Sequence, residues 1–292
     1  MSQQDLLARI AAAQPTLSRK ASAVARYLAE HYVEAGYLTT REIARASGVG
    51  LTTVVRFPAM LGYADMEALK AAIQDRVGVD LTAVERMQAM SAKGGPKSVL
   101  ARMIDSDVTA LRSLGRTIDE AQLERCARLL AEASSITVLG LRWLRPIAEY
   151  AAYALAKVRP GVGAILHGDS TLGDRLEELG RNDLLVAVAV ARYPRDTVEA
   201  AQRARARGMR IIALTDGPLS PLAPLADEAL FVRQEPFDFI GSLGAMGALV
   251  NVLVTLTAQR LGPSATQRLD MLERASAAGG TYAGDARQVR KR

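Results

Sequence analysis

The sequence predicts a two-domain protein, in which an all-α helix-turn-helix bundle precedes a three-layer α/β sandwich built on a parallel sheet. The first 77 of the 292 residues show short helical patterns separated by glycine-containing turns. From residue 136 onward, short continuous apolar runs alternate with helical patterns, which is typical of parallel strands buried on both faces. A hinge signal, Gly94-Gly95-Pro96, lies between the two halves. We expect bounds of 1–77 for the bundle, 78–97 for a linker, 98–262 for the sandwich and 263–292 for a C-terminal helix and tail.

The expected bundle contains helices with clear start and stop signals. Ser18 precedes an amphipathic pattern, and Thr39 with Glu42 three residues later fits a capping box that satisfies the first free amides of a helix. That helix ends near Gly48, and the next begins shortly afterwards, so the two form a helix-turn-helix pair. A further helix is expected over 65–76.

The expected sheet comes from five apolar runs, each short enough for a strand. They lie at residues 136–140, 163–168, 183–190, 210–216 and 228–233. In a parallel sheet of this kind, ligands bind beyond the carboxyl ends of the strands. The loops at those ends are 140–146, 167–171, 191–197 and 215–221.

Composition argues against several classes of protein. The net charge is +6, but no segment concentrates it into a basic tail, so nucleic-acid binding would need a shaped surface. Cys126 is the only cysteine and lies in a helical pattern, which predicts a buried thiol and no disulfide. His31 and His167 are too few for a metal cluster, and the sequence has neither a GxGxxG fingerprint nor a P-loop. We expect no metal, no cofactor and no catalytic residue.

One apolar stretch is long enough to span a bilayer, since no charged residue occurs between Asp238 and Arg260. It contains Asn251 and other polar residues, so we expect a buried helix of the second domain. The N-terminus carries charges early and lacks the apolar core of a signal peptide. A cytoplasmic protein without a membrane partner is expected, with a disordered tail over 279–292.

Residues 1–77 resemble the N-terminal helix-turn-helix domain of RpiR-type transcriptional regulators. The resemblance is carried by Thr53-Val54-Val55-Arg56-Phe57 and by Leu61-Gly62-Tyr63. The second half resembles the sugar isomerase (SIS) domain that these regulators carry, most clearly at IIALTDGPLSPLAPLADEALFV, residues 211–232. The resemblance implies a recognition helix over 50–61 and a homodimer or higher homo-oligomer.

The recognition helix has an inward and an outward face. Val54, Phe57 and Leu61 share one side and should pack inward, which leaves polar residues toward a DNA groove, where threonine and arginine can contact base edges. The predicted DNA-binding residues are Thr52, Thr53, Arg56, Arg41 and Ser47. The alternative is that these are ordinary exposed helix residues. Pro58 departs from the family pattern, and we expect a bend or early fraying beyond the residues that read DNA.

The second domain departs from its family in two loops. SIS domains that hold phosphosugars have a Gly-x-Gly-Ser-Ser turn and a Ser-x-Ser-Gly-x-Thr turn. Here these positions read GLRWL (140–144) and AVARYP (189–194), so only Gly140 remains and every serine and threonine hydroxyl of the pattern is lost. Arginine forks suit a carboxylate or phosphate, and the predicted effector-binding residues are Gly140, Arg142, Arg192, Tyr193, Arg195 and Thr215. Alternatively, these arginines and Arg145 point to solvent or pair with Glu149, Asp169 or Asp196.

The two resemblances together predict that the chain is a transcriptional regulator of a metabolic operon. Its partners are a double-stranded DNA operator and a small anionic metabolite, with an organic acid favoured over a phosphosugar because forks match a planar carboxylate. One alternative is an interaction module without a small ligand. Another is a sugar isomerase, for which His167 and Asp169 lie at a plausible strand end.

Overall fold

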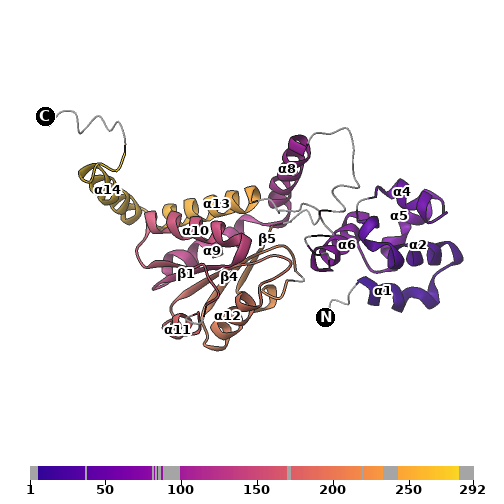
Figure 1. Ribbon diagram of the computed structural model, residues 1–292, viewed down its shortest axis with the longest axis horizontal. Helices are drawn as coiled ribbons and strands as arrows, with labels where there is room; N and C mark the ends of the chain where they lie inside the picture. Colours follow the sequence, from indigo (N-terminus) through magenta and orange to yellow (C-terminus); the bar gives the residue numbers. More distant parts are fainter. Residues whose placement is uncertain are drawn as a thin grey trace. The chain divides into compact units, whose positions relative to one another are not determined.

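The computed structural model describes residues 6–36, 38–80, 99–169, 172–218, 220–232 and 243–282, together with the single positions 82, 84 and 87 (Figure 1). These residues divide into two compact units, one up to residue 87 and one from residue 99 onward. The predicted hinge at 94–96 and the tail beyond residue 282 lie outside the described residues.

The first unit is all-helical, as the sequence predicts. Its α-helices are α1 (Leu6–Ala13), α2 (Arg19–Glu30), α3 (Tyr32–Ala35), α4 (Thr40–Ala46), α5 (Leu51–Met60) and α6 (Met66–Asp80), and a short 3-10 helix (Gln14–Thr16) follows α1. They pack around one apolar core, whose largest fully buried side chains are Leu28, Ile43, Phe57, Leu69 and Ile73. Helix α6 runs to Asp80, so it continues past the predicted end at residue 76 and into the segment expected as linker.

The α4–turn–α5 segment forms where the capping signals place it. The amide of Glu42 donates to Thr39 Oγ1 at 3.2 Å, and the amide of Thr39 donates to Glu42 Oε2 at 2.6 Å. The Thr39 amide and the Thr39 hydroxyl both donate to the Glu42 carboxylate, and these two bonds lower the pKa of Glu42. Gly48 has a φ of +68°, a left-handed conformation that glycine adopts without strain, and it turns the chain toward α5.

The second unit is a three-layer α/β/α sandwich, which confirms the predicted fold class. Its five parallel strands lie in the order β2-β1-β3-β4-β5. Their bounds are β1 Ile136–Gly140, β2 Val162–Ile165, β3 Leu184–Val188, β4 Arg210–Thr215 and β5 Glu228–Phe231. Strand β2 ends three residues before the predicted end, so Leu166, His167 and Gly168 belong to the loop beyond it.

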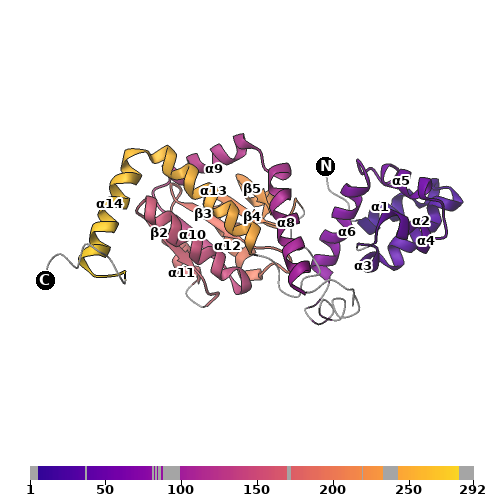
Figure 2. The same ribbon diagram turned by 90° about the horizontal axis from the view of Figure 1, so that it is seen from above.

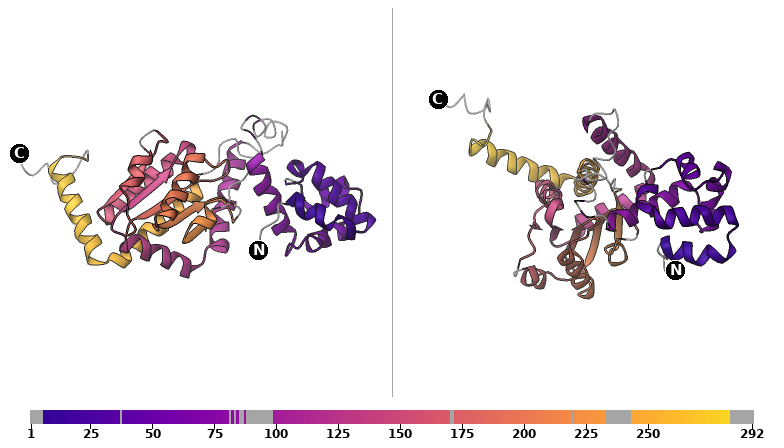
Figure 3. Two further views of the ribbon diagram at one scale, coloured as in Figure 1. Left: turned by 90° about the horizontal axis from the view of Figure 1, so that it is seen from below. Right: turned by 45° about the vertical axis from the view of Figure 1, so that its right-hand side comes forward.

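Helices cover both faces of this sheet. Four of them pack on one face, namely α8 (Val99–Thr117), α9 (Glu120–Glu132), α10 (Arg145–Val158) and α13 (Gly244–Leu261), while α11 (Leu172–Glu177) and α12 (Arg195–Ala206) cover the other (Figure 1). Helices α10 and α13 run side by side over the sheet (Figure 2). Helix α14 (Pro263–Ala278) follows α13 after the single residue Gly262 and projects beyond the sheet (Figure 3).

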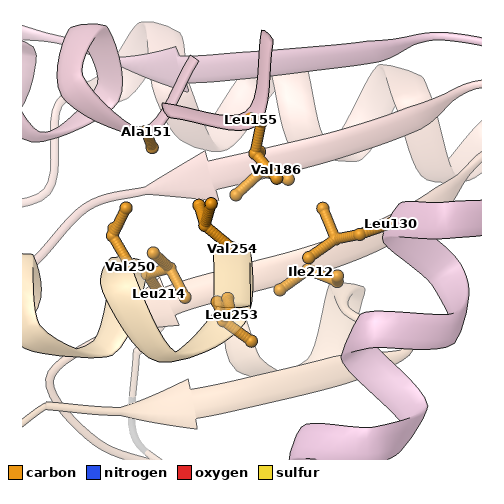
Figure 4. Close-up of a pocket in the computed structure, with 9 residues that line it drawn as sticks. All are labelled: Leu130, Ala151, Leu155, Val186, Ile212, Leu214, Val250, Leu253 and Val254. Atoms are coloured by element: carbon orange, nitrogen blue, oxygen red, sulfur yellow. The ribbon is translucent and has the colours of Figure 1, made fainter. Parts of the chain in front are cut away.

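The face under α10 and α13 has no room for a ligand. A void of about 10 Å³ lies there, close to the smallest space that a water molecule needs (Figure 4). Its lining is entirely aliphatic: Leu130, Ala151, Leu155, Val186, Ile212, Leu214, Val250, Leu253 and Val254. No small molecule larger than water fits between these helices and the sheet.

Two expectations about individual segments are confirmed. From Gly244 onward the long apolar stretch forms α13, whose buried side faces the core through Met246, Leu249 and Leu253, and residues 239–242 lie outside the described residues. Within the described ranges, no helix has the length and apolar character that crossing a membrane requires. Cys126 is buried on α9, and burial raises the pKa of its thiol to about 12, so the thiol is protonated and inert.

Candidate functional sites

Helix α5 presents one packed and one exposed side. Val54 and Phe57 are completely buried and Leu61 nearly so, which confirms the inward face. Thr52 and Arg56 are exposed, as DNA contacts require, whereas Thr53 is only partly exposed and lies at the border of the packed side. The N-cap residue Gly50 has no side chain to cover the first amides of α5.

The other two predicted DNA contacts lie on α4 and its end. Arg41 is exposed on α4, and one turn later Arg45 is exposed too, although the sequence reading missed it. Ser47 is partly buried and its hydroxyl donates to the carbonyl of Ile43 at 2.6 Å, so its proton is used inside the helix. Since Arg41, Arg45 and Arg56 form no ion pair with another described residue, the α4–α5 segment carries three cations open to an anion.

Pro58 leaves the exposed start of α5 intact. The helix continues for two residues beyond it, to Met60. The Pro58 carbonyl accepts the amides of both Leu61 and Tyr63 at 3.0 Å, and these bonds close the helix end. The Arg9 guanidinium holds the same end, because it stacks 4.7 Å from the centre of the Tyr63 ring and donates to the Leu61 carbonyl. The proline therefore acts near the end of the helix, away from Thr52 and Arg56.

In the second unit, the carboxyl ends of β1 and β3 form a topological switch point. The chain leaves β1 through α10 to reach β2 on one side of the sheet, and leaves β3 through α12 to reach β4 on the other. In open α/β sheets, ligands bind at such a point, between the loops that follow the two strands. Register pairs Gly140 with Val188 at this edge, which brings the Arg142 and Arg192 loops next to each other.

Gly140 is needed for packing. A Cβ atom at this position would lie 2.5 Å from Ala148 Cβ and 3.2 Å from the Leu144 carbonyl oxygen. Helix α10 thus packs directly on the end of β1, and the glycine permits this approach. Its predicted role in the effector site would be indirect, through the position of the loop that it begins.

The four arginines of the two loops differ in their surroundings. Arg195 forms an ion pair at 2.6 Å with Glu199 on the same helix. Glu199 was not among the acidic partners predicted from the sequence. The Arg145 guanidinium lies 3.1 Å from His167 Nε2. Arg142 and Arg192 are exposed and form no ion pair with any residue that the structure describes. Arg142 also has a φ of +57°, a strained conformation for a residue with a side chain, at the position where the family pattern has its second glycine.

Tyr193 and Thr215 belong to a buried polar network around Asp216. Asp216 was not among the site residues predicted from the sequence. The Asp216 carboxylate accepts the Ala191 amide and the Tyr193 hydroxyl, both at 2.8 Å; we call these three residues the Asp216 clamp. Thr215 is fully buried and donates to Ser220 Oγ at 2.6 Å. Burial raises the pKa of Asp216, and the hydrogen bonds oppose that rise. The clamp fixes the loop that carries Arg192 to the end of β4.

A polar cavity of about 320 Å³ lies between α11 and α12, beside the end of β2. Its lining includes the carboxylates of Asp169, Asp196 and Glu199 as well as Arg203. A Cβ atom on Gly168 would lie 2.2 Å from Asp196 Oδ2 and 3.3 Å from Leu141 Cδ1. The cavity therefore adjoins the loop that carries Arg142. Within the described part of the chain, no three His, Cys, Asp or Glu side chains are grouped as a metal site would require.

Comparison with known proteins agrees with this architecture. The SIS domain family matches residues 129–256. A protein of Caldanaerobacter subterraneus subsp. tengcongensis, described as an uncharacterized HTH-type transcriptional regulator, is 24% identical over 264 residues, which are 88% of this chain and 91% of that protein.

Two solved structures are similar as well. The sugar isomerase domain of an RpiR transcription factor from Sphaerobacter thermophilus is 27% identical with a TM-score of 0.57, over 61% of this chain and 99% of that one. Vibrio vulnificus NanR complexed with ManNAc-6P is 24% identical with a TM-score of 0.58, over 94% of this chain and 98% of that one. The NanR likeness extends the shared fold to both units.

Proposed function

We propose that this chain, which carries a SIS domain at residues 129–256 behind a helix-turn-helix domain as RpiR-type regulators do, is a DNA-binding transcriptional regulator that responds to a small anionic metabolite. The observation that carries the DNA-binding half is the exposed start of α5 with Thr52 and Arg56, next to helix α4, which carries the exposed Arg41 and Arg45. Hydroxyls and guanidinium groups on a helix start suit the major groove.

Dimerisation follows from the small size of this contact, since a single α5 helix offers few side chains to DNA. Two protomers would bind two related half-sites, with centres one helical turn apart (about 10 base pairs) or a multiple of it. Footprinting of the full chain on its selected operator should show two protected segments in separate major grooves. A monomeric mass at the same concentration, together with one protected segment, would contradict the dimer.

The effector site is proposed at the switch point between β1 and β3. Arg142 and Arg192 have no acidic partner among the described residues, so an anion would balance their charge. The adjoining cavity of about 320 Å³ has the volume of a small-metabolite site, and its carboxylates can accept hydrogen bonds from hydroxyl groups. An organic acid with hydroxyl groups suits both parts of this site, since its carboxylate would meet the two arginines and its hydroxyl groups would donate to the carboxylates of the cavity. A phosphosugar, the class of compound that NanR holds, is the second candidate.

Replacing Arg192 by alanine should lower the affinity for this effector about tenfold, because one charge-assisted hydrogen-bonding group is lost. Calorimetry on the full chain with matched hydroxy acids and sugar phosphates measures the change. Arg274→Ala is the control, since Arg274 lies on α14, pairs with Asp270 at 2.7 Å and is largely exposed. Tight phosphosugar binding that survives the Arg192 change would contradict the proposed arginine clamp and indicate that backbone amides hold the phosphate.

The same titration separates the regulator from its two alternatives. A sensor binds the metabolite without turnover, an interaction module binds none, and an isomerase converts its substrate. The sensor is favoured because the hydroxyl-bearing loops are replaced and because His167, the strand-end candidate for a base, faces the Arg145 guanidinium.

A further inference from the structure

Between residues 6 and 80, the exposed aliphatic side chains that the structure describes lie on one helix. Among the side chains described between residues 6 and 80, three large apolar ones are exposed: Leu51 (43%), Val55 (56%) and Met60 (46%). All three belong to α5. The remaining large apolar side chains described between residues 6 and 80 are buried or half-buried in the core, and beyond α6 the only ones described in this unit, those of Val84 and Met87, are exposed. Such a concentration on one short helix marks a contact surface.

Val55 lies well inside the exposed arc of α5, whereas Leu51 and Met60 lie at its edges. At 100° per residue, positions 51, 52, 55, 56, 59 and 60 share the exposed arc, while 54, 57 and 58 form the buried one. Around the helix axis, Val55 thus lies between Leu51 and Thr52. Arg56, the next residue, points outward from the same arc.

The charges of the α4–α5 segment point to DNA as the partner. Arg56 follows Val55 on α5, Arg41 and Arg45 lie on α4, which packs against α5, and none of the three forms an ion pair in the described ranges. A polyanion complements this surface. In the major groove, the C5-methyl group of thymine is the apolar feature that aliphatic side chains contact. A β-branched valine offers two methyl groups on a stiff side chain, so such a contact costs little conformational entropy.

We propose that Val55, with Leu51 at its side, reads the methyl group of a thymine in each operator half-site, next to the base that Arg56 contacts. The proposal rests on the proposed DNA-binding function and names the base chemistry that α5 selects. It makes Val55 a specificity-determining residue that the sequence reading had not singled out.

The experiment removes methyl groups from the DNA and from the protein. An operator is selected from random duplexes with the full chain, and each thymine is then replaced by uracil, which differs only by lacking the methyl group. Wild type should lose about fourfold in affinity at one thymine of each half-site, the value expected for one buried methyl group. Val55→Ala should bind the thymine operator more weakly and show no further loss with uracil there. Val55→Thr, which keeps one methyl group, should retain part of the thymine preference, and Arg56→Ala should retain all of it.

Each contrary result has a distinct meaning. Specific operator binding that is indifferent to uracil at every position would overturn the role of Val55 while leaving the DNA-binding function in place. An undiminished uracil effect in Val55→Ala would assign the methyl contact to another residue and overturn the proposal as well. Failure to select any DNA sequence would overturn the proposed function itself.

Discussion

Replacing Arg56 by alanine is expected to weaken operator binding by about 1–3 kcal/mol, or roughly 5- to 150-fold. Arg56 is exposed on α5 beside Thr52, and it forms no ion pair with another described residue that would restrain its guanidinium. A bidentate contact with guanine is the strongest specific contact such a side chain makes. Titration of the selected operator by fluorescence anisotropy at fixed salt measures the loss.

Arg45→Ala is the matched comparison, because Arg45 is exposed on α4. A phosphate contact should weaken binding evenly across sequences and reduce the salt slope by about one, whereas a base contact relaxes the preference at one position. Binding of Arg56→Ala with wild-type affinity and preference would remove Arg56 from the interface.

Replacing Gly140 by alanine should lower the free energy of unfolding of the SIS domain by about 1–3 kcal/mol. The added Cβ would lie 2.5 Å from Ala148 Cβ, so α10 must move away from the end of β1. A loss of about 2 kcal/mol would lower the melting temperature by roughly 4–8 °C in a domain of this size. Differential scanning calorimetry of the full chain gives the midpoint of this domain.

Gly163→Ala is the control, since Gly163 lies on neighbouring β2 and its added Cβ would meet no atom within 4 Å. This variant should melt close to wild type. Equal melting temperatures for the two variants would show that α10 can yield without cost, and the packing role of Gly140 would then be wrong.

The layout of both units could be predicted because it depends on local signals. Thr39 and Glu42 form their capping box within four residues, and the strands are continuous apolar runs that only a buried sheet accommodates. The resemblance of the second half to a SIS domain is confirmed by the family match at residues 129–256. The end of β2 was placed too late, since apolar Leu166 extends the run beyond the last ladder residue, Ile165.

The sites could be predicted only in part, because they depend on neighbours that are distant in sequence. Asp216 reaches Tyr193 and Ala191 only after β3 and β4 pair, and no local pattern shows this. The cavity beside β2 likewise forms only when α11 and α12 pack. By contrast, two features were visible in the sequence and were overlooked. The inward spacing of Val54, Phe57 and Leu61 places Val55 on the outer side of its helix. Arg195 and Glu199 have the spacing of an ion pair within one helix.

In the loop after β3, the groups that hold the loop in place differ from the side chains proposed to bind a ligand. The Asp216 clamp holds the segment after β3 through one backbone amide and the Tyr193 hydroxyl, so the side chains of Arg192 and Arg195 take no part in the anchoring. Residues 192 and 195 can therefore be substituted in related sensors without a change in the backbone conformation of the loop. New specificities could therefore arise, by evolution or by grafting, from exchanges at these two positions on an unchanged scaffold.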